Sequence, residues 1–583
     1  MIIRNRDPRT MLAARATLST RMPGSGCASL GDRAGARSMT PTTTAHVREG
    51  APGAARASGR FASNVRFLAG VWVLAFSFYG LTGIGHSSSW DSILTVLSAR
   101  NFFYRGDLAV PAYPGTKGMH KQGVDGRHYI KFAPGLVFAH LPMLAVSRVA
   151  KHFPLLRLPS GERPKGRYED EFWVQLTNAW ITASLLVLLA LFVMDLGGSR
   201  RDAWMIVLVV GIASPVWIYA RADSTEALQG LALLGAAYFL HRGRVGRGVW
   251  RHSVAGAFAG LAILSKTFNA VLIPLFLVYL LTTTRSRRVT ALGAFLAPIA
   301  VAAALSGLYN YARFGSPFDT GYDFAVERFD KPLAAGMSKL LFSPSYGLVV
   351  FWPASLLILI GARRQWRAHP AETTLAAGVF IAVLFLYASW WAFQGFGWAP
   401  RFLIPAIPLL ALLMIPVVTS TRRAARIATI ACLLAGVSVQ TLACTTNHWQ
   451  QVLYGVFGEV DCGRDASRCH DDPRIAPLRI ALWRVHAAYL RVHHPERFAA
   501  HVEAPPWRNS HPWRAPEKLA ERQWENTGVD FWAAPTRWRL EWYYLWAPGM
   551  KVQIPSSPML AGLLAVLAGS ALLIVRRSLD ERG

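Results

Sequence analysis

Asp91 is the acidic residue best placed to do chemistry, because it stands near the start of a patterned segment at residues 87–107. Apolar residues at 93, 94, 97, 102 and 103, with serines before them and Gly106 after them, predict a short amphipathic helix lying in a membrane interface. A carboxylate held there can accept a proton from an attacking hydroxyl group. The alternative is that Asp91 only complements the dipole at the start of this helix.

A second polar string follows at residues 124–135, Val-Asp-Gly-Arg-His-Tyr-Ile-Lys-Phe-Ala-Pro-Gly. It contains Asp125, Tyr129 and Lys131, and Asp107 stands between it and the first string. The apolar stretch at 136–149 is short for a membrane span and is interrupted by proline. We expect it to form a second interfacial or re-entrant helix on the same face.

Several cations stand at the ends of apolar segments. Lys266 lies one turn inside an apolar hairpin, where an ionised group costs about 2.5 to 3.5 kcal/mol. It therefore needs a partner, for which a phosphate and Glu226 are both candidates. Arg221, Arg313 and Arg401 are placed where their side chains could simply reach the membrane interface. Each cation thus has a structural explanation beside a ligand-binding one.

The segment from 310 to 346 is rich in Gly, Pro, Phe and Tyr and contains acids at 319, 323 and 327. Aromatic faces such as that of Tyr322 suit the apolar side of a sugar ring, and the acids suit its hydroxyls. The alternative is a structured loop that packs on its own aromatic side chains.

Twelve apolar segments position these residues. Of the 583 residues, 52% are hydrophobic and only 16% are charged, which is typical of a membrane protein. A span needs about 20 mainly apolar residues. We predict an all-α polytopic membrane protein of about 12 transmembrane helices, near residues 65–85, 172–194, 202–220, 225–241, 253–268, 270–284, 290–309, 346–361, 373–391, 400–418, 425–445 and 557–575.

Clustered Lys and Arg mark alternate connections, on the side of the Arg-rich N-terminal tail. Positive charge near span ends is retained in the cytoplasm, so both termini are expected there. The loops at 86–171, 310–345 and 446–556 then lie outside. The net charge of +29 is explained by these connections and the tail facing anionic lipids. Nucleic-acid binding is not favoured, because no base-reading module is evident.

The remaining regions complete the predicted organisation. Residues 1–64 are expected to form a disordered basic cytoplasmic tail without a signal peptide, so that the first span stays as an anchor. Residues 65–445 form the transmembrane core, and 446–556 form a small extracytoplasmic domain or lid. Residues 557–583 form the last helix and a cytoplasmic tail.

Cysteines and histidines in the 446–556 region leave two questions open. Cys462 and Cys469 could form a disulfide outside the cytoplasm or remain free thiols. The strings His470-Asp471-Asp472 and His493-His494 lack zinc-site spacing. We favour acceptor recognition, or a lid over the site, as the use of this region.

The order of these motifs resembles that of the GT-C polyprenyl-phosphate-dependent glycosyltransferases, which include protein O-mannosyltransferases and aminoarabinose transferases. The resemblance covers about residues 67–418 and depends on several weak motifs in sequence. They are the acid after the first span, Asp-Gly-x-x-Tyr-x-Lys-x-x-Pro-Gly at 125–135, Ser-Pro-Val-Trp-Ile-Tyr-Ala-Arg-Ala-Asp at 214–223, Gly-Leu-Ala-Ile-Leu-Ser-Lys-Thr at 260–267, Tyr-Asn-Tyr-Ala-Arg-Phe-Gly-Ser-Pro at 309–317, and Trp-Ala-Pro-Arg-Phe-Leu at 398–403.

The resemblance implies an enzyme of the bacterial cytoplasmic (inner) membrane that moves a sugar from a polyprenyl-phosphate carrier to a lipid, glycan or protein acceptor outside. By position Asp91 matches the general base. Ser92 stands where the family often has a second acid that could bind a divalent metal, a role that Asp107 or Asp125 could take instead. The implied donor-phosphate ligands are Lys131, Arg221, Lys266, Arg313 and Arg401. The candidate substrate-binding residues are Asp107, Asp125, Tyr129, Glu226 and Tyr322.

Two other classes of protein remain as alternatives. A secondary transporter or lipid flippase would be expected to show internal repeats and charged residues in the middle of spans, and neither is evident. A noncatalytic membrane scaffold presenting residues 446–556 should tolerate loss of Asp91. No Gly-rich phosphate loop is present, so a cytoplasmic nucleotide-using reaction lacks a site.

Overall fold

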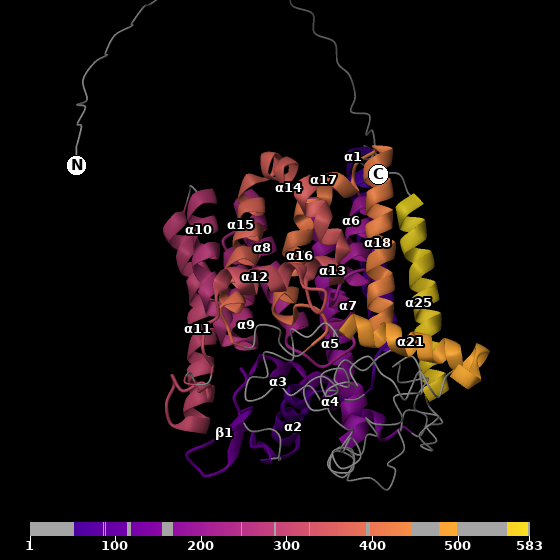
Figure 1. Ribbon diagram of the computed structural model, residues 1–583. Coiled ribbons are helices and arrows are strands. Elements are labelled where there is room, and N and C mark those ends of the chain that lie inside the picture. The colour runs from indigo at the N-terminus through magenta and orange to yellow at the C-terminus, as the bar shows by residue number, and fades with distance from the viewer. Residues whose placement is uncertain are drawn as a thin grey trace, which may run out of the picture. The chain divides into compact units, whose positions relative to one another are not determined.

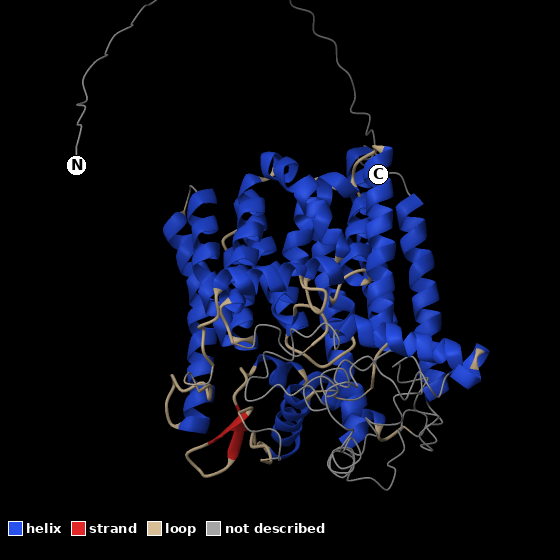
Figure 2. Ribbon diagram, in the orientation of Figure 1, coloured by secondary structure: helices blue, strands red, loops and turns tan. Residues whose placement is uncertain are grey.

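A computed structural model of the protein describes residues 52–580 except 86, 88, 113–117, 154–166, 247, 285–286, 324, 326, 392–396, 445–476 and 498–556. The chain divides into two units, residues 1–56 and 57–583, and the second carries the features below. It consists mostly of helices packed side by side (Figures 1 and 2).

The protein is a multi-pass membrane protein. Seven helical segments among the described residues are long and apolar enough to cross a bilayer: Ser63–Leu81, Asp170–Asp195, Arg288–Phe314, Pro370–Ala388, Arg401–Val418, Arg423–Cys444 and Ala561–Asp580. They belong to α1 (Pro52–Leu81), α5 (Arg167–Asp195), α11 (Arg288–Phe314), α15 (Pro370–Ala388), the broken helix made of η4 (Arg401–Ala406), α16 (Ile407–Ala411), η5 (Leu412–Met414) and α17 (Ile415–Val418), α18 (Arg423–Cys444) and α25 (Ser557–Asp580).

The other five predicted spans are also helical, but the helices are shorter or less apolar. They are α6 (Arg200–Gly211) with α7 (Val216–Ala220), α8 (Glu226–Val245), α9 (Trp250–Ser265), η2 (Thr267–Leu272) with α10 (Ile273–Thr283), and α13 (Leu348–Phe351) with η3 (Pro353–Ser355) and α14 (Leu356–Ala368). The number of twelve spans therefore stays a prediction. A further short helix, α12 (Leu333–Phe342), packs against α15.

The bundle is centred on α8, which is buried on nearly every face and contacts α5, α9 and η4. A helix that is apolar all round belongs inside a protein. Small residues let its neighbours approach closely. A Cβ atom added at Gly256 of α9 would lie 2.1 Å from the carbonyl oxygen of Phe295 in α11, so these two helices touch through their backbones.

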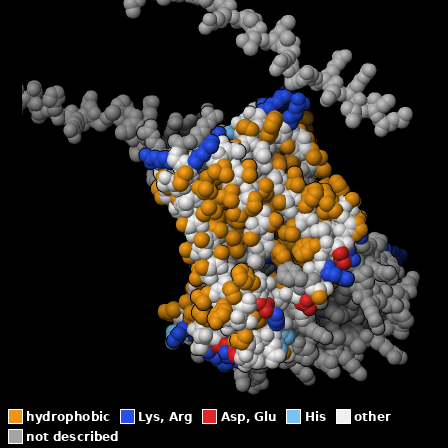
Figure 3. All heavy atoms as spheres, turned by 90° about the vertical axis from the view of Figure 1, so that its left-hand side faces the viewer, with side chains coloured by type: hydrophobic (Ala, Val, Ile, Leu, Met, Phe, Trp, Pro, Cys, Tyr) orange, Lys and Arg blue, Asp and Glu red, His pale blue; other side chains and the backbone are white. Residues whose placement is uncertain are grey.

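Lys and Arg side chains stand at one end of the bundle away from the acidic side chains that are visible near the other end (Figure 3). This end contains Arg200 and Arg244 and is here called the arginine end. Arg200 at the start of α6 donates to Asn64 Oδ1 and to the carbonyl oxygen of Ser578, both at 2.8 Å. Arg244 at the end of α8 lies 2.7 Å from Glu372 at the start of α15. The structure thus brings together several of the predicted cytoplasmic turns. Their assignment to the cytoplasm stays a prediction.

The opposite end, here called the loop end, carries the segment between α1 and α5. It contains α2 (Trp90–Arg105), β1 (His120–Gln122), β2 (His128–Ile130), α3 (Gly135–Ala139) and α4 (Leu141–Ala150). The two predicted helices of this segment are confirmed, and the second is split at His140. The apolar face of α2 is buried against α4 and α5 in a core of its own, with Leu94, Leu144 and Val174 fully buried.

The expectation of an all-helical chain is wrong in one place. Residues 120–130 form a two-stranded antiparallel hairpin, with His120 opposite Ile130 and Gln122 opposite His128. The turn needs Gly126, whose φ of +79° favours glycine. Gly123 is also required, because a Cβ atom there would lie 2.5 Å from the carbonyl oxygen of Arg313 at the end of α11. The hairpin therefore packs directly on that helix.

Some predictions fall outside the described residues. These include the tail before residue 52, most of the region 446–556, both Cys462 and Cys469, and the His470-Asp471-Asp472 string. Within that region the structure describes α21 (Pro477–His493), which contacts α18. No group of three or more His, Cys, Asp or Glu suited to a metal occurs among the residues that are described.

Candidate functional site

Asp91 is held in place by the cap of α2. The helix begins after Ser89, whose side chain accepts a hydrogen bond from the backbone N–H of Ser92 at 3.0 Å. The Ser92 hydroxyl donates in turn to the carbonyl oxygen of Asp223, which joins this end of α2 to the segment before α8. Since the apolar face of α2 is buried, the first turn of the helix has little freedom to move.

Arg401 joins Asp91 to Glu226. Its Nε donates to Glu226 Oε1 at 2.7 Å, and its Nη1 donates to Asp91 Oδ2 at 3.3 Å. The Glu226 side chain is 1% exposed, that of Arg401 is 14% exposed and that of Asp91 is 31% exposed. Three predicted residues from α2, α8 and η4 therefore meet. Asp91 alone keeps a substantial surface that a substrate hydroxyl could reach.

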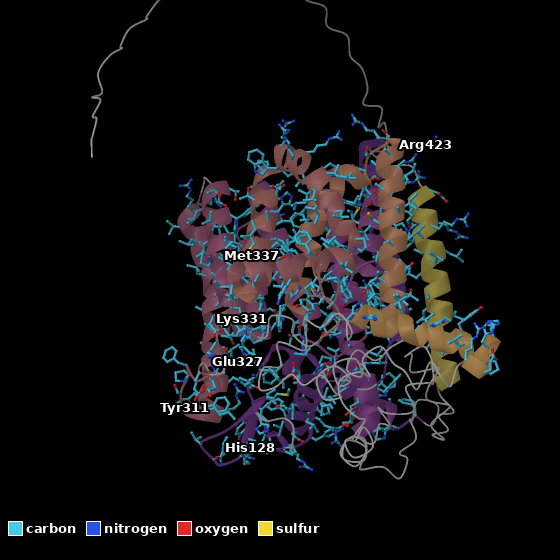
Figure 4. The ribbon with its side chains drawn as sticks, viewed as in Figure 1. His128, Tyr311, Glu327, Lys331, Met337 and Arg423 are labelled. Atoms are coloured by element: carbon cyan, nitrogen blue, oxygen red, sulfur yellow. The ribbon has the colours of Figure 1, made fainter. Side chains whose placement is uncertain are left out.

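Lys131 and Glu327 form a second ion pair across the same space, with Lys131 Nζ 2.5 Å from Glu327 Oε1. The other carboxylate oxygen of Glu327 accepts hydrogen bonds from the indole N–H groups of Trp390 at 3.1 Å and Trp391 at 3.0 Å. Lys131 Nζ also lies 4.8 Å from the centre of the Tyr322 ring. Glu327 is thus held from three sides, and Figure 4 places it toward the loop end, opposite Arg423.

Lys266 is surrounded by aromatic rings. Its Nζ lies 4.0 Å from the ring centre of Phe402, 4.8 Å from that of Tyr387 and 6.0 Å from that of Trp390. The pairing with Glu226 that the sequence suggested is not found within 4.0 Å, because Glu226 is engaged by Arg401. Within the described part of the chain no carboxylate lies within 4.0 Å of Lys266. Among the three cations discussed so far, it is therefore the best placed to receive an anion.

These groups surround one cavity of about 290 Å³. It lies near the lower end of the range of roughly 300 to 1,000 Å³ that is usual for small-molecule sites. Five of the predicted site residues line it: Asp91, Lys131, Lys266, Tyr322 and Arg401. The full lining is Asp91, Ser92, Thr95, Gly118, Met119, Lys131, Phe132, Ala133, Leu136, Asp223, Ser224, Thr225, Ser265, Lys266, Thr267, Tyr322, Glu327, Trp390, Trp391, Arg401 and Phe402.

Two predicted phosphate ligands lie away from the cavity lining. Arg313 is buried at the end of α11, where it donates to the carbonyl oxygen of Tyr309 at 3.1 Å, to Asn310 Oδ1 at 2.9 Å and to the carbonyl oxygen of Ile130. Its contacts attach α11 to the hairpin. Arg221 is also buried, at 3% exposure, directly after α7. Neither side chain is among the residues that line the cavity.

Three predicted substrate-binding residues form a separate cluster on the hairpin. Arg127 lies 2.9 Å from Asp107 and 2.6 Å from Asp125, and the Tyr129 hydroxyl donates to Asp125 at 2.6 Å. The hydrogen bond from Tyr129, with help from Arg127, lowers the pKa of Asp125 to about 2. Burial and the bond to Asp125 raise the pKa of Tyr129 to about 12. These acids already have close partners and do not line the cavity.

Sequence reasoning missed part of the lining. Trp390 and Trp391 were not singled out, although a tryptophan pair after an apolar segment is a sign of a membrane interface. Phe402 was named only within a motif. Asp223 was recognised only within a motif. The structure shows its Oδ1 2.9 Å from His140 Nε2, with both side chains fully buried. His140 lies at the break between α3 and α4, a position that the sequence pattern did not reveal.

Comparisons with known proteins give a distant likeness only. No protein-family model matches the chain, and no curated protein matches it significantly. Its fold is similar to that of ArnT from Cupriavidus metallidurans in two crystal structures. The form bound to undecaprenyl phosphate is 14% identical and the apo form 15% identical; each match has a TM-score of 0.44 and covers 88% of this chain and 78% of that chain. At this level the likeness describes a helical arrangement and carries no argument about chemistry.

Proposed function

We propose that this chain is an integral membrane glycosyltransferase that moves a sugar from a polyprenyl-phosphate carrier to an acceptor on the extracytoplasmic face. The observation that carries the proposal is the convergence of Asp91, Lys131, Lys266 and Arg401 on one cavity. These residues come from four segments spread over 310 positions. The cavity is at the end of the bundle opposite the clustered arginines, which the positive-inside rule assigns to the cytoplasm.

Each group has a defined part in the reaction. The phosphate of the donor would lie at Lys266, where its negative charge replaces the missing carboxylate partner. The sugar ring would pack on the aromatic faces of Trp390 and Trp391, with Glu327 accepting from its hydroxyls. Asp91 would take the proton of the acceptor hydroxyl as that oxygen attacks the anomeric carbon.

The bond changes balance without a further reactant. The new bond joins the acceptor oxygen to the anomeric carbon, and the broken bond joins that carbon to the phosphate oxygen. The electron pair of the broken bond leaves with the polyprenyl phosphate, whose charge Lys266 and Lys131 stabilise. Direct displacement would invert the configuration of the anomeric carbon. No metal is required by this scheme, and a divalent metal is not assigned a place in it.

The test uses the purified full-length protein in proteoliposomes with a panel of radiolabelled polyprenyl-phosphate sugars. Asp91→Asn is expected to lower the transfer rate by about 10²- to 10⁴-fold, the usual contribution of a positioned general base. The matched control is Asp125→Asn, the same substitution in the hairpin, which should transfer sugar as the wild type does.

Two results would contradict the proposal. Full transfer by Asp91→Asn would remove this residue as the base. Absence of transfer from every donor in the panel would favour a transporter, a flippase or a noncatalytic scaffold.

A further inference from the structure

A second cavity, of about 720 Å³, lies at the arginine end of the bundle between α6, α18 and α25. We call it the basic groove. It has no part in the chemistry proposed above, because that chemistry belongs to the loop end. Its lining consists of Ser199, Arg201, Asp202, Trp204, Met205, Val418, Thr419, Ser420, Thr421, Arg426, Thr429, Ile430, Leu572, Val575, Arg576, Leu579 and Asp580.

One wall of the groove is cationic. Arg201, Arg426 and Arg576, here called the groove arginines, come from three different helices. Arg201 lies 3.9 Å from Asp580, but both side chains are 70% exposed, and such a pair is weak. Within the described part of the chain, Arg426 and Arg576 have no carboxylate within 4.0 Å. The arginines therefore remain available to an anion.

The acids of the groove do not cancel this charge. Asp202 is occupied by the cap of α6, where its Oδ2 accepts from the Ser199 backbone N–H at 2.8 Å and from the Ser199 hydroxyl at 2.7 Å. Three arginines therefore face two carboxylates, one of which has a local structural role. Arginine side chains are well suited to phosphate, because their N–H groups form a planar fork that matches two phosphate oxygens.

The part of the groove away from the groove arginines, here called the apolar wall, is lined by apolar side chains and continues into the lipid-facing surface. Ile430 and Leu572 are 51% and 52% exposed, and they lie on helices long and apolar enough to span the membrane. Trp204 also lines the groove and lies one helical turn after Arg200 and Arg201 in α6, and tryptophan is enriched at membrane interfaces. A ligand in the groove would thus meet cations at one end and hydrocarbon at the other.

The packing of α25 keeps this groove open and fixed. Gly70 of α1 lets α25 approach closely, since a Cβ atom there would lie 2.9 Å from Val575 Cγ2. Arg200 binds both α1, through Asn64, and the last turns of α25, through Ser578. The position of α25 is therefore set largely by its contacts with α1 and Arg200, and the space between α6, α18 and α25 need not be filled by protein side chains.

We propose that the basic groove binds one anionic phospholipid, with its phosphate among the groove arginines and its acyl chains along the apolar wall. A basic pocket between membrane helices on the cytoplasmic side is a recognised form of lipid site. A soluble phosphate would use only the cationic end and would leave the apolar wall unexplained. The lipid would hold α25 against the rest of the bundle.

The test is native mass spectrometry of the full-length protein released from nanodiscs that contain phosphatidylglycerol and phosphatidylcholine in equal amounts. The wild type should retain phosphatidylglycerol more than about tenfold over phosphatidylcholine, since each cation near a headgroup contributes roughly fivefold. Equal retention of the two lipids would overturn the proposal. Displacement of phosphatidylglycerol by excess inorganic phosphate would do so too, because it would identify a soluble anion site.

A matched pair of variants separates the groove from general surface charge. The groove variant carries Gln at all three groove arginines and should lose the preference for phosphatidylglycerol. The control variant carries Gln at three exposed arginines of α14, residues 363, 364 and 367, and should keep it. Equal loss in both variants would show that the total charge of this end is responsible, and the proposal would be wrong.

A second measurement needs only the wild type and is independent of how the variants fold. A phosphatidylglycerol with a photoreactive acyl chain should label peptides containing Ile430 and Leu572. Labelling spread evenly over all lipid-facing helices would contradict a bound lipid.

Discussion

Two arginines in this protein each join two carboxylates, and they do so in very different settings. Arg401 joins Asp91 and Glu226, which are 310 and 175 positions away in the sequence, with a side chain that is 14% exposed. Arg127 joins Asp107 and Asp125, which are 20 and 2 positions away, with a side chain that is 55% exposed. The first pairing borders the cavity, and the second closes a surface hairpin.

The difference shows that a bridging arginine is not by itself a sign of a functional site. Around Arg127 the backbone alone brings the partners together, and Tyr129 completes the set at Asp125. Around Arg401 the whole bundle must fold before the partners meet, and Asp91 is left 31% exposed beside Lys266 in the cavity lining. Charges brought together over long sequence distances beside a cavity are the ones to test for function.

The largest expected effect is on folding and comes from Arg401→Gln. This change leaves the Glu226 carboxylate buried without its cation, which should lower the free energy of unfolding by about 3 to 5 kcal/mol. Arg127→Gln breaks ion pairs of an exposed side chain and should lower the free energy of unfolding far less. The free energy of unfolding of both variants can be measured by unfolding them in graded detergent mixtures. Similar losses in the two variants would remove the distinction between the two arginines.

Adding Glu226→Gln to Arg401→Gln sharpens the same comparison. The double variant has no buried unpaired charge, so it should recover part of the lost stability. If it is no more stable than Arg401→Gln alone, the loss comes from packing and not from the stranded carboxylate.

The next effect concerns donor binding at Lys266. Lys266→Met removes the ammonium group that the aromatic rings surround. It should weaken binding of a polyprenyl phosphate by about 10-fold or more, since a hydrogen bond to a charged group contributes about 1.5 to 3 kcal/mol. Lys266→Arg keeps the charge and should bind more tightly than Lys266→Met. Binding can be followed by quenching of the tryptophans in the cavity lining. Unchanged affinity in Lys266→Met would place the phosphate elsewhere.

A smaller effect is expected at the Lys131–Glu327 ion pair, which is largely buried. The more exposed Lys121–Asp319 ion pair serves as its control. Glu327→Gln removes the charge that holds Lys131 and two indole groups, and should lower the transfer rate by roughly 10-fold through lost positioning. Asp319→Asn breaks the exposed Lys121–Asp319 pair, whose atoms are 2.6 Å apart, and should leave transfer unchanged. The measurement is the initial rate of sugar transfer by each of the two variants with the same donor. Equal transfer rates in the two variants would show that Glu327 does not contribute to the reaction.

The smallest effect lies in the pH dependence of the hairpin. The hydrogen bond from Tyr129 holds the pKa of Asp125 at about 2 in the folded protein. Its ordinary value is about 3.9. A depressed pKa stabilises the fold above the ordinary value, and this contribution is lost as the pH falls toward 2. Tyr129→Phe should therefore lower the melting temperature slightly at pH 6, and the difference should shrink between about pH 4 and pH 2. A difference that stays constant with pH would exclude this coupling.

Local signals in the sequence were enough to predict most of the helices. Serine before Asp91 and glycine at 106 define the ends of α2, and hydrophobicity located the helical segments of the bundle. The hairpin was missed because its strands are only three residues long and half-exposed. Their sequence therefore lacks the alternation of apolar residues that would predict a strand. Gly123 and Gly126 were the only local indications of a turn.

The partners of the cations could not be predicted in the same way. Arg221 follows a helix, Arg313 lies in the last turn of one and Arg401 begins one. From the sequence, each could equally reach an interface, a ligand or a backbone oxygen. Only the packing of distant segments decides between these uses. It gives Arg313 three backbone and amide acceptors inside the protein and gives Arg401 two carboxylates beside a cavity.

Occupancy of the cavity by the donor is the most direct measurement of the central claim. A polyprenyl-phosphate sugar with a photoreactive group on the sugar would be added to the full-length Asp91→Asn protein, which should bind the donor without consuming it. The labelled peptides are expected to contain Lys266 and the segment around Trp390 and Arg401. Label confined to the hairpin around Arg127, or scattered over the lipid-facing helices, would contradict the account.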